Sequence, residues 1–201
     1  MVDLLLPGED LMPMVPANPN YYTDFVPLVR WQSTYNISPI IGTAAVFHGL
    51  SQPPAQPPNV APSDPDISTP LFTMCLLHDI NPNGAHIYCK TIDRFWQMRR
   101  DSGIAADGTK FVGYWYPNAA FKSNNKSILV SHYEPADGAR RVVIIGNISK
   151  EPQPFTLQAP PGWRASLANA RDAFTKEKVD ASKPLELKKR GYWVIELSKP
   201  K

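Results

Sequence analysis

The stretch ILVSHYEPADGARRVVIIGNIS, residues 128–149, decides the fold of the C-terminal half of this chain. Two runs rich in β-branched and aliphatic residues lie on either side of PADG. Such runs are typical of strands, and Asp-Gly is typical of the tight turn that joins two antiparallel strands. The stretch therefore predicts a β-hairpin that turns at Asp137 and Gly138.

Further short runs of strand-forming residues follow the same pattern on both sides of this hairpin. They are KFVGYWYP, PFTLQ, WRASLA, RDAF, PLELKKR and GYWVIELS, separated by residues that favour turns. Closely spaced short strands are typical of an antiparallel β-sandwich. We expect residues 111–201 to form such a sandwich.

Residues 1–110 have a different pattern, which predicts a mixed α/β segment. Of the 22 prolines in the chain, 13 lie before residue 71. The apolar run VDLLL and residues 39–47 suit buried strands. Helices are predicted within residues 23–35, from Pro70 to about Leu77, and within residues 90–103, where Gly103 is a helix-stop signal. Residues 51–66 hold too many prolines for a regular helix or a central strand and predict a long loop.

Composition and charge exclude several classes of protein. No apolar run reaches the roughly 20 residues of a membrane helix, and the first residues lack the basic region of a signal peptide. Residues 1–119 carry 6 Lys and Arg against 10 Asp and Glu, and the remainder carries 15 against 8. Because the C-terminal cations are scattered, this asymmetry favours two units over a nucleic-acid site. Neither a nucleic acid nor a membrane is expected as a partner.

Several motifs, in this order, resemble a known group of enzymes. LLHDI, DRFWQMRRDSGI, FVGYWYPN, the hairpin stretch and the closing GYWVIEL resemble the C-terminal portion of large bacterial glycoside hydrolases related to family 123. The resemblance runs from about Glu9 to Leu197. It implies the end of a (β/α)8-type barrel followed by a C-terminal β-sandwich, an α+β fold, and a parent that is bacterial and exported or periplasmic.

The chain departs from that group because the first several strands of the barrel are missing. A partial barrel exposes strand edges and its inner apolar layer. Two alternatives stay open: the chain is a fragment, or it covers its core by forming a homo-oligomer. In the family the catalytic carboxylates lie on earlier strands, so a fragment of this extent can lack them.

Glycoside hydrolysis needs two carboxyl groups that flank the scissile bond. Glu9 and Asp79 each follow an apolar element and are the candidate catalytic residues. Each has a structural alternative. Glu9 suits a turn residue in PGED, and Asp79 suits the first loop residue after a helix.

Two histidines and three aromatic residues are the candidate substrate-binding residues. His48 and His78 each end an apolar element, and either can serve instead as a structural residue, with His78 meeting the last carbonyls of a helix. Trp31, Tyr114 and Tyr116 can pack flat rings on the apolar faces of sugars or belong to the core. If residues 114–116 form a strand, their rings alternate between its two faces.

The sequence contains no spacing that indicates a metal or a cofactor. Two functions follow, both with carbohydrate as the partner. The first is a glycoside hydrolase, or its C-terminal part, that uses carboxylates as general acid and base. The alternative is a non-catalytic carbohydrate-binding or accessory β-sandwich module.

Overall fold

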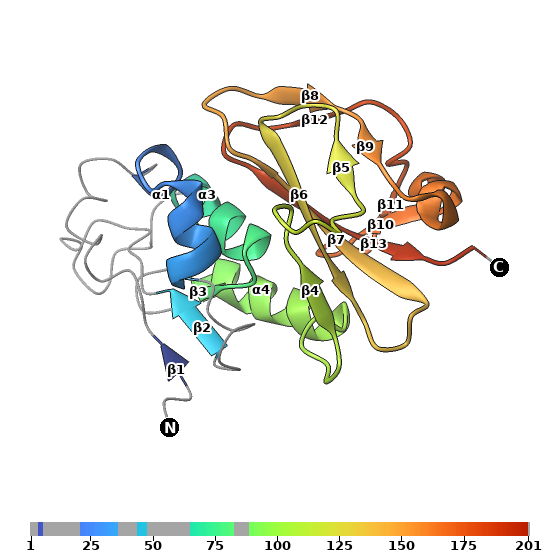
Figure 1. The fold of residues 1–201 in the computed structure, drawn as a ribbon, viewed down its shortest axis with the longest axis horizontal. Coiled ribbons are helices and arrows are strands. Elements are labelled where there is room, and N and C mark those ends of the chain that lie inside the picture. The colour runs from blue at the N-terminus through green and yellow to red at the C-terminus, as the bar shows by residue number, and fades with distance from the viewer. Residues whose placement is uncertain (1–3, 6–20, 36–43, 48–64, 83–88, 201) are drawn as a thin grey trace. The chain divides into compact units, whose positions relative to one another are not determined.

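The computed structural model describes residues 4–5, 21–35, 44–47, 65–82 and 89–200 (Figure 1). Its contacts define two compact units, Met1–Asp93 and Arg94–Lys201. Helix α4 (Cys89–Asp101) crosses this division. The domain boundary between residues 110 and 111 stays a prediction.

Three short parallel strands form the sheet of the first unit. They are β1 (Leu4–Leu5), β2 (Ala44–Phe47) and β3 (Asn81–Pro82), in the order β1-β2-β3. Leu4 pairs with Ala44, and Val46 pairs with Asn81. Parallel neighbours need a long crossover connection, and helix α3 lies between β2 and β3 in the chain, as in a βαβ unit.

Helix α3 (Pro65–Leu77) begins before the predicted start, so that Pro70 lies inside it. Proline suits the first helical position because its φ is fixed near the helical value, and Pro65 carries the same signal as Pro70. The helix ends at Leu77, as predicted. Residues 71–78 are all buried, which is typical of a helix covered on every side.

The predicted helix within residues 23–35 is interrupted. The structure has a short helix α1 (Tyr21–Asp24) and then a π-helix η2 (Arg30–Tyr35). Pro27 lies between them, and proline removes an amide donor and disfavours helical backbone in the residue before it. The chain restarts with a hydrogen bond of 2.9 Å from the Arg30 amide to the Pro27 carbonyl.

Six strands of the second unit form one antiparallel sheet in the order β11-β10-β13-β7-β6-β4. They are β4 (Lys110–Val112), β6 (Ile128–Glu134), β7 (Arg140–Asn147), β10 (Ala170–Asp172), β11 (Lys178–Val179) and β13 (Tyr192–Ser198). The predicted hairpin is confirmed: β6 pairs with β7, and Gly138 in the turn has φ 64°. Glycine adopts this left-handed conformation without steric cost.

Two smaller antiparallel pairs accompany this sheet, β12 (Leu185–Leu187) with β8 (Gln153–Phe155) and β5 (Lys122–Ser123) with β9 (Leu157–Gln158). The expected strand WRASLA is instead part of a 3-10 helix, η4 (Pro161–Asn169). Pro161 follows Pro160 and fixes a helical φ at the start of η4. Trp163 and Leu167, four residues apart in η4, are both buried.

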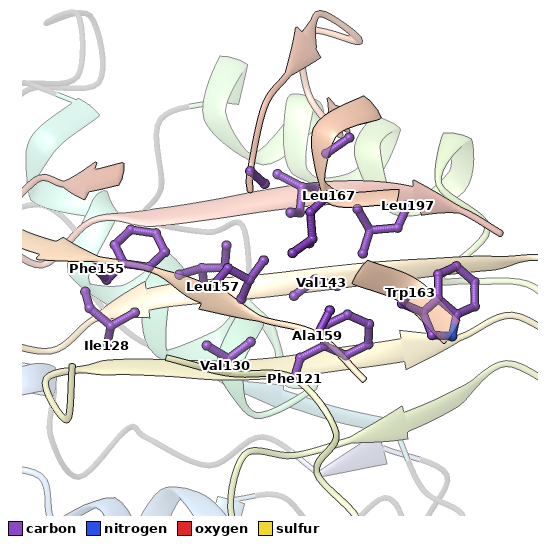
Figure 2. Packing of buried hydrophobic residues seen from close by; sticks show 14 of the residues in the cluster. Phe121, Ile128, Val130, Val143, Phe155, Leu157, Ala159, Trp163, Leu167 and Leu197 are labelled. Carbon is purple, nitrogen blue, oxygen red and sulfur yellow. The ribbon is translucent and has the colours of Figure 1, made fainter. Parts of the chain in front are cut away.

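One hydrophobic cluster connects the large sheet to the smaller pairs and to η4. Figure 2 shows Phe155 and Leu157 lying over residues of β6 and β7. On β7, the alternate residues Val143 and Ile145 point into this cluster. Burying an apolar side chain of this size stabilises a fold by about 1.5–3 kcal/mol, so this cluster contributes strongly to the stability of the second unit.

The described residues are therefore mixed α+β, with antiparallel sheets in the second unit and without a closed barrel. The finer assignments, a partial (β/α) barrel before residue 110 and a β-sandwich after it, remain proposals. No helix within the described ranges is long and apolar enough to cross a membrane.

Candidate functional site

The end of helix α3 places the predicted residues His78 and Asp79. The Ile80 amide donates a hydrogen bond of 2.9 Å to the Cys75 carbonyl, and Asp79 between them has φ 55°. A left-handed residue bridged by this bond is a Schellman helix terminus. Asp79 thus occupies a position that usually favours glycine or asparagine, and its backbone conformation ends the helix.

His78 is fully buried and its ring lies against another predicted residue. Its Nδ1 is 2.7 Å from the Met74 carbonyl oxygen, so Nδ1 carries the proton in this hydrogen bond. The Trp31 ring stacks on the imidazole, with 5.7 Å between centroids and 27° between planes. Burial lowers the pKa of His78 to about 4, although the bond to Met74 acts in the opposite direction. His78 is therefore neutral at pH 7.

The structure brings Trp31 and His78 together inside the first unit, where neither side chain is exposed. Their geometry fits the structural alternative, in which the histidine satisfies the end of a helix. Asp79, which is half-buried, lies just before β3. The other two predicted residues of this half, Glu9 and His48, lie outside the described residues.

Tyr114, Trp115 and Tyr116 form an aromatic cluster in the second unit. The ring of Trp115 makes edge contacts with both neighbours, at 4.9 Å from Tyr114 and 5.0 Å from Tyr116. Phe111 of β4 extends the cluster at 6.0 Å from Trp115. All four residues are half-buried, so each leaves part of its surface in contact with solvent.

Tyr114, Trp115 and Tyr116 lie in a turn after β4 and not in a strand, so the condition for alternating rings is not met. The turn is closed by a bond of 2.9 Å from the Tyr116 amide to the Gly113 carbonyl. The Tyr114 amide donates to the Ser131 hydroxyl of β6 at 3.1 Å. A Cβ atom at Gly113 would lie 2.6 Å from the Trp115 ring, so the indole packs directly on the glycine.

A charged cluster on β6 and β7 was not predicted from the sequence. His132 Nε2 lies 3.3 Å from Glu134 Oε1, and Arg141 Nε lies 3.4 Å from the same oxygen. The Arg141 guanidinium lies 4.7 Å from the Trp163 ring centroid. The signal was the i, i+2 spacing of His132 and Glu134, which places both on one face of a strand.

Burial lowers the pKa of His132, the hydrogen bond and charge of Glu134 raise it, and the Arg141 charge lowers it. The second ring nitrogen, Nδ1, is buried and has no hydrogen-bond partner within the described part of the chain. Such groups are rare in folded proteins. No group of three or more His, Cys, Asp or Glu residues with the geometry of a metal site occurs among the described residues.

Comparisons with known proteins give glycoside hydrolases among the similar solved structures. The β-galactosidase Gan42B of glycoside hydrolase family 42, from G. stearothermophilus, matches 55% of this chain at 17% identity and a TM-score of 0.31. A family 27 β-L-arabinopyranosidase from Geobacillus stearothermophilus matches 38% at 20% identity and a TM-score of 0.29. A family 42 exo-carrageenase from Bacteroides ovatus matches 98% at 8% identity and a TM-score of 0.31.

This chain corresponds to 13%, 18% and 22% of the length of these three structures, in the same order. TM-scores near 0.3 do not establish a common fold, and none of the three is a family 123 enzyme. No protein-family model matches the sequence. No curated protein matches it either.

Proposed function

We propose that this chain is the C-terminal part of a glycoside hydrolase-type protein, and that its second unit binds carbohydrate at the aromatic cluster without cleaving it. The observation that carries this proposal is the group of half-buried aromatic residues Tyr114, Trp115 and Tyr116, whose rings contact one another. Aromatic rings with one apolar face and a polar tip suit a sugar, whose C–H groups pack on the ring while its hydroxyls form hydrogen bonds.

The packing of the cluster supports a preformed surface. Trp115 is fixed on Gly113, and the Ser131 hydroxyl holds the backbone at Tyr114. A surface that is ordered before the ligand arrives loses less conformational entropy on binding. The Trp31 and His78 pair offers no comparable surface, because both rings are fully buried.

Affinity electrophoresis of the full chain in gels that contain soluble polysaccharides tests this function. We expect retardation by at least one glycan, and Tyr116→Ala should weaken it about fivefold, since one ring contact contributes about 1 kcal/mol. Trp96→Ala is the matched control, because it removes an exposed ring outside the cluster. No retardation by any glycan, or equal loss in both variants, contradicts the proposal.

A second variant tests whether the shape of the cluster matters. Gly113→Ala forces the Trp115 ring to move and should cost about 2 kcal/mol of unfolding free energy, the usual range for overpacking. Gly162→Ala is its control, because a Cβ there meets nothing within 4 Å. We expect Gly113→Ala to lose glycan retardation, and urea denaturation gives the stability change. Retained retardation despite a displaced ring would show that the cluster does not bind the glycan.

The second candidate function is hydrolysis of a polysaccharide or glycan by Glu9 and Asp79. The parallel pairing of β1 with β2 favours it, since barrel active sites form at the carboxyl ends of such strands and Glu9 follows β1 in the sequence. Asp79 fits this less well, because it precedes β3.

A screen of aryl glycosides and polysaccharides tests this activity, with the solution mass measured on the same sample to test for a homo-oligomer. Turnover that is lost in Glu9→Gln, with an unchanged circular dichroism spectrum, supports hydrolysis. The Asp79→Asn variant then tests the second carboxylate. Absence of turnover in the unmodified chain, as monomer or oligomer, rejects hydrolysis as its function.

A further inference from the structure

A small pocket lies in the second unit between helix α4 and the turn that joins β10 to β11. Its volume is about 140 Å³. Pockets for drug-sized ligands usually measure about 300–1,000 Å³, so this smaller space suits a single ring-sized group and not a long ligand. The lining residues are Arg94, Gln97, Met98, Asp101, Ala173, Phe174 and Lys176.

The turn that forms one wall is held firmly by Asp172. Its Oδ1 accepts hydrogen bonds of 2.8 Å from the amides of Phe174 and Thr175, and its Oδ2 accepts one of 2.6 Å from Trp193 Nε1. The Lys176 amide donates to the Asp172 carbonyl at 2.8 Å. These four bonds fix the position of Phe174 before any ligand binds.

The helix side of the pocket presents the exposed polar groups of three residues. Arg94, Gln97 and Asp101 are exposed, and within the described ranges none of their side chains forms a hydrogen bond or an ion pair. The Arg94 guanidinium lies 5.9 Å from the centroid of the Phe174 ring. The pocket therefore combines one aromatic wall with a guanidinium, an amide and a carboxylate.

The charges of the pocket nearly cancel. Lys176 Nζ lies 2.7 Å from Glu196 Oε1, so its charge is already paired. The remaining charges are the cation of Arg94 and the anion of Asp101. A strongly charged ligand would meet attraction from one of them and repulsion from the other, whereas an uncharged ligand with several hydroxyl groups can use both.

From these features we propose that this pocket binds one neutral monosaccharide unit, separate from the aromatic cluster. Planar guanidinium, amide and carboxylate groups can each form paired hydrogen bonds, which suits the adjacent hydroxyls of a sugar. Phe174 supplies the apolar contact for the C–H groups of the ring. The proposal rests on the proposed function, since it assumes that the chain binds carbohydrate.

The test is a titration of the ¹⁵N-labelled full chain with methyl glycosides of neutral hexoses and pentoses, followed by NMR. Glucuronate and sulfate are titrated separately as charged probes. We expect the amides of Gln97, Phe174 and Lys176 to shift with a neutral glycoside. Gln97→Ala and Asp101→Asn should each raise the Kd at these amides at least fivefold, while Arg100→Ala, on the same helix but outside the lining, should leave it unchanged.

The outcomes separate this proposal from the proposed function. Shifts at Tyr114 and Tyr116 without shifts at Phe174 overturn the pocket and leave the aromatic cluster standing. Shifts at Phe174 alone support the pocket and count against the cluster. Larger shifts at Phe174 with glucuronate or sulfate than with any neutral glycoside overturn the ligand class, and silence at all of these amides overturns both proposals.

Discussion

The two units each bury a histidine, and the neighbours of the two rings differ. His78 ends helix α3 of the first unit, bonded to a backbone carbonyl and stacked on Trp31. His132 lies in the middle of strand β6 in the second unit, with Glu134 at hydrogen-bond distance and the Phe121 ring in edge contact. Burial lowers the pKa of both rings.

The difference lies in what opposes burial. At His78 the opposing influence is the Met74 carbonyl, a neutral dipole, and the pKa falls to about 4. At His132 it is a carboxylate, whose charge favours the protonated ring, while Arg141 disfavours it. A full charge stabilises an imidazolium more than a dipole does. The surroundings of each ring therefore decide how its unit responds to acid. The ordinary pKa of histidine alone does not set either response.

Asn147 extends this comparison to a buried polar side chain that does not titrate, and it gives the largest expected effect. Its Nδ2 donates to the carbonyls of Glu151, Leu187 and Lys188 at 2.9, 3.2 and 3.0 Å, and its Oδ1 accepts from the Ser149 amide at 2.8 Å. Asn147→Ala removes all four bonds and should cost about 4 kcal/mol, at about 1 kcal/mol for each bond, independent of pH.

Urea denaturation at pH 7 and pH 5 measures that cost. Ser182→Ala is the control, since it removes an exposed hydroxyl that bonds to Asp180, two residues away. We expect a change within about 0.5 kcal/mol for the control. A loss below 1 kcal/mol in Asn147→Ala would show that water replaces these bonds, and that the second unit tolerates unpaired polar groups.

His78 gives the next largest effect, and this one depends on pH. Its folded pKa of about 4 lies below the ordinary 6.5, so the unfolded chain takes up a proton first as the pH falls. Stability is complete above about pH 6.5 and declines towards pH 4. At about 1.36 kcal/mol for each pH unit, the loss approaches about 3 kcal/mol.

Hydrogen exchange at the Ile80 amide, which is bonded to Cys75, reports on this region directly. His78→Asn keeps a donor near the position of Nδ1 but does not titrate. In this variant the protection of the Ile80 amide should therefore vary little between pH 6.5 and pH 4, after correction for intrinsic exchange. An equal decline in both proteins would show that another group controls the acid sensitivity of the first unit.

Local signals explain which parts of the fold were predictable. The hairpin turn at Gly138 and the end of helix α4 depend on a few adjacent residues, and both were predicted correctly. The break at Pro27 also had a local signal, but the apolar residues on either side suggested a continuous helix. At η4, the prolines before Trp163 outweighed a run of residues that also suits a strand.

The candidate site was less predictable, because its properties depend on residues far apart in the chain. Trp31 and His78 were both selected from the sequence, but their mutual stacking and complete burial come from packing between separate elements. Likewise, the position of Arg141 beside Glu134 follows from the pairing of β6 with β7, and its contact with Trp163 follows from the placement of η4. No short stretch of sequence contains that information.

The smallest expected effect tests the role assigned to Glu134. Glu134→Gln keeps a hydrogen-bonding group beside His132 but removes the charge that raises the pKa of the ring, while the opposing charge of Arg141 remains. The pKa of His132 should fall further, and the stability of the second unit below pH 6.5 should decrease by less than about 1 kcal/mol, because the side chain of Glu134 is partly exposed and screened by solvent.

An NMR titration of the histidine Cε1 protons measures this pKa, with His132→Gln identifying the signal. Asp137→Asn is the matched control, since Asp137 is a carboxylate of the same hairpin that pairs with Arg140 instead. We expect the pKa of His132 in Asp137→Asn to equal its pKa in the unmodified chain. If Glu134→Gln leaves that pKa unchanged, the charge of Glu134 does not control His132, and the comparison with His78 then loses the carboxylate as its explanation.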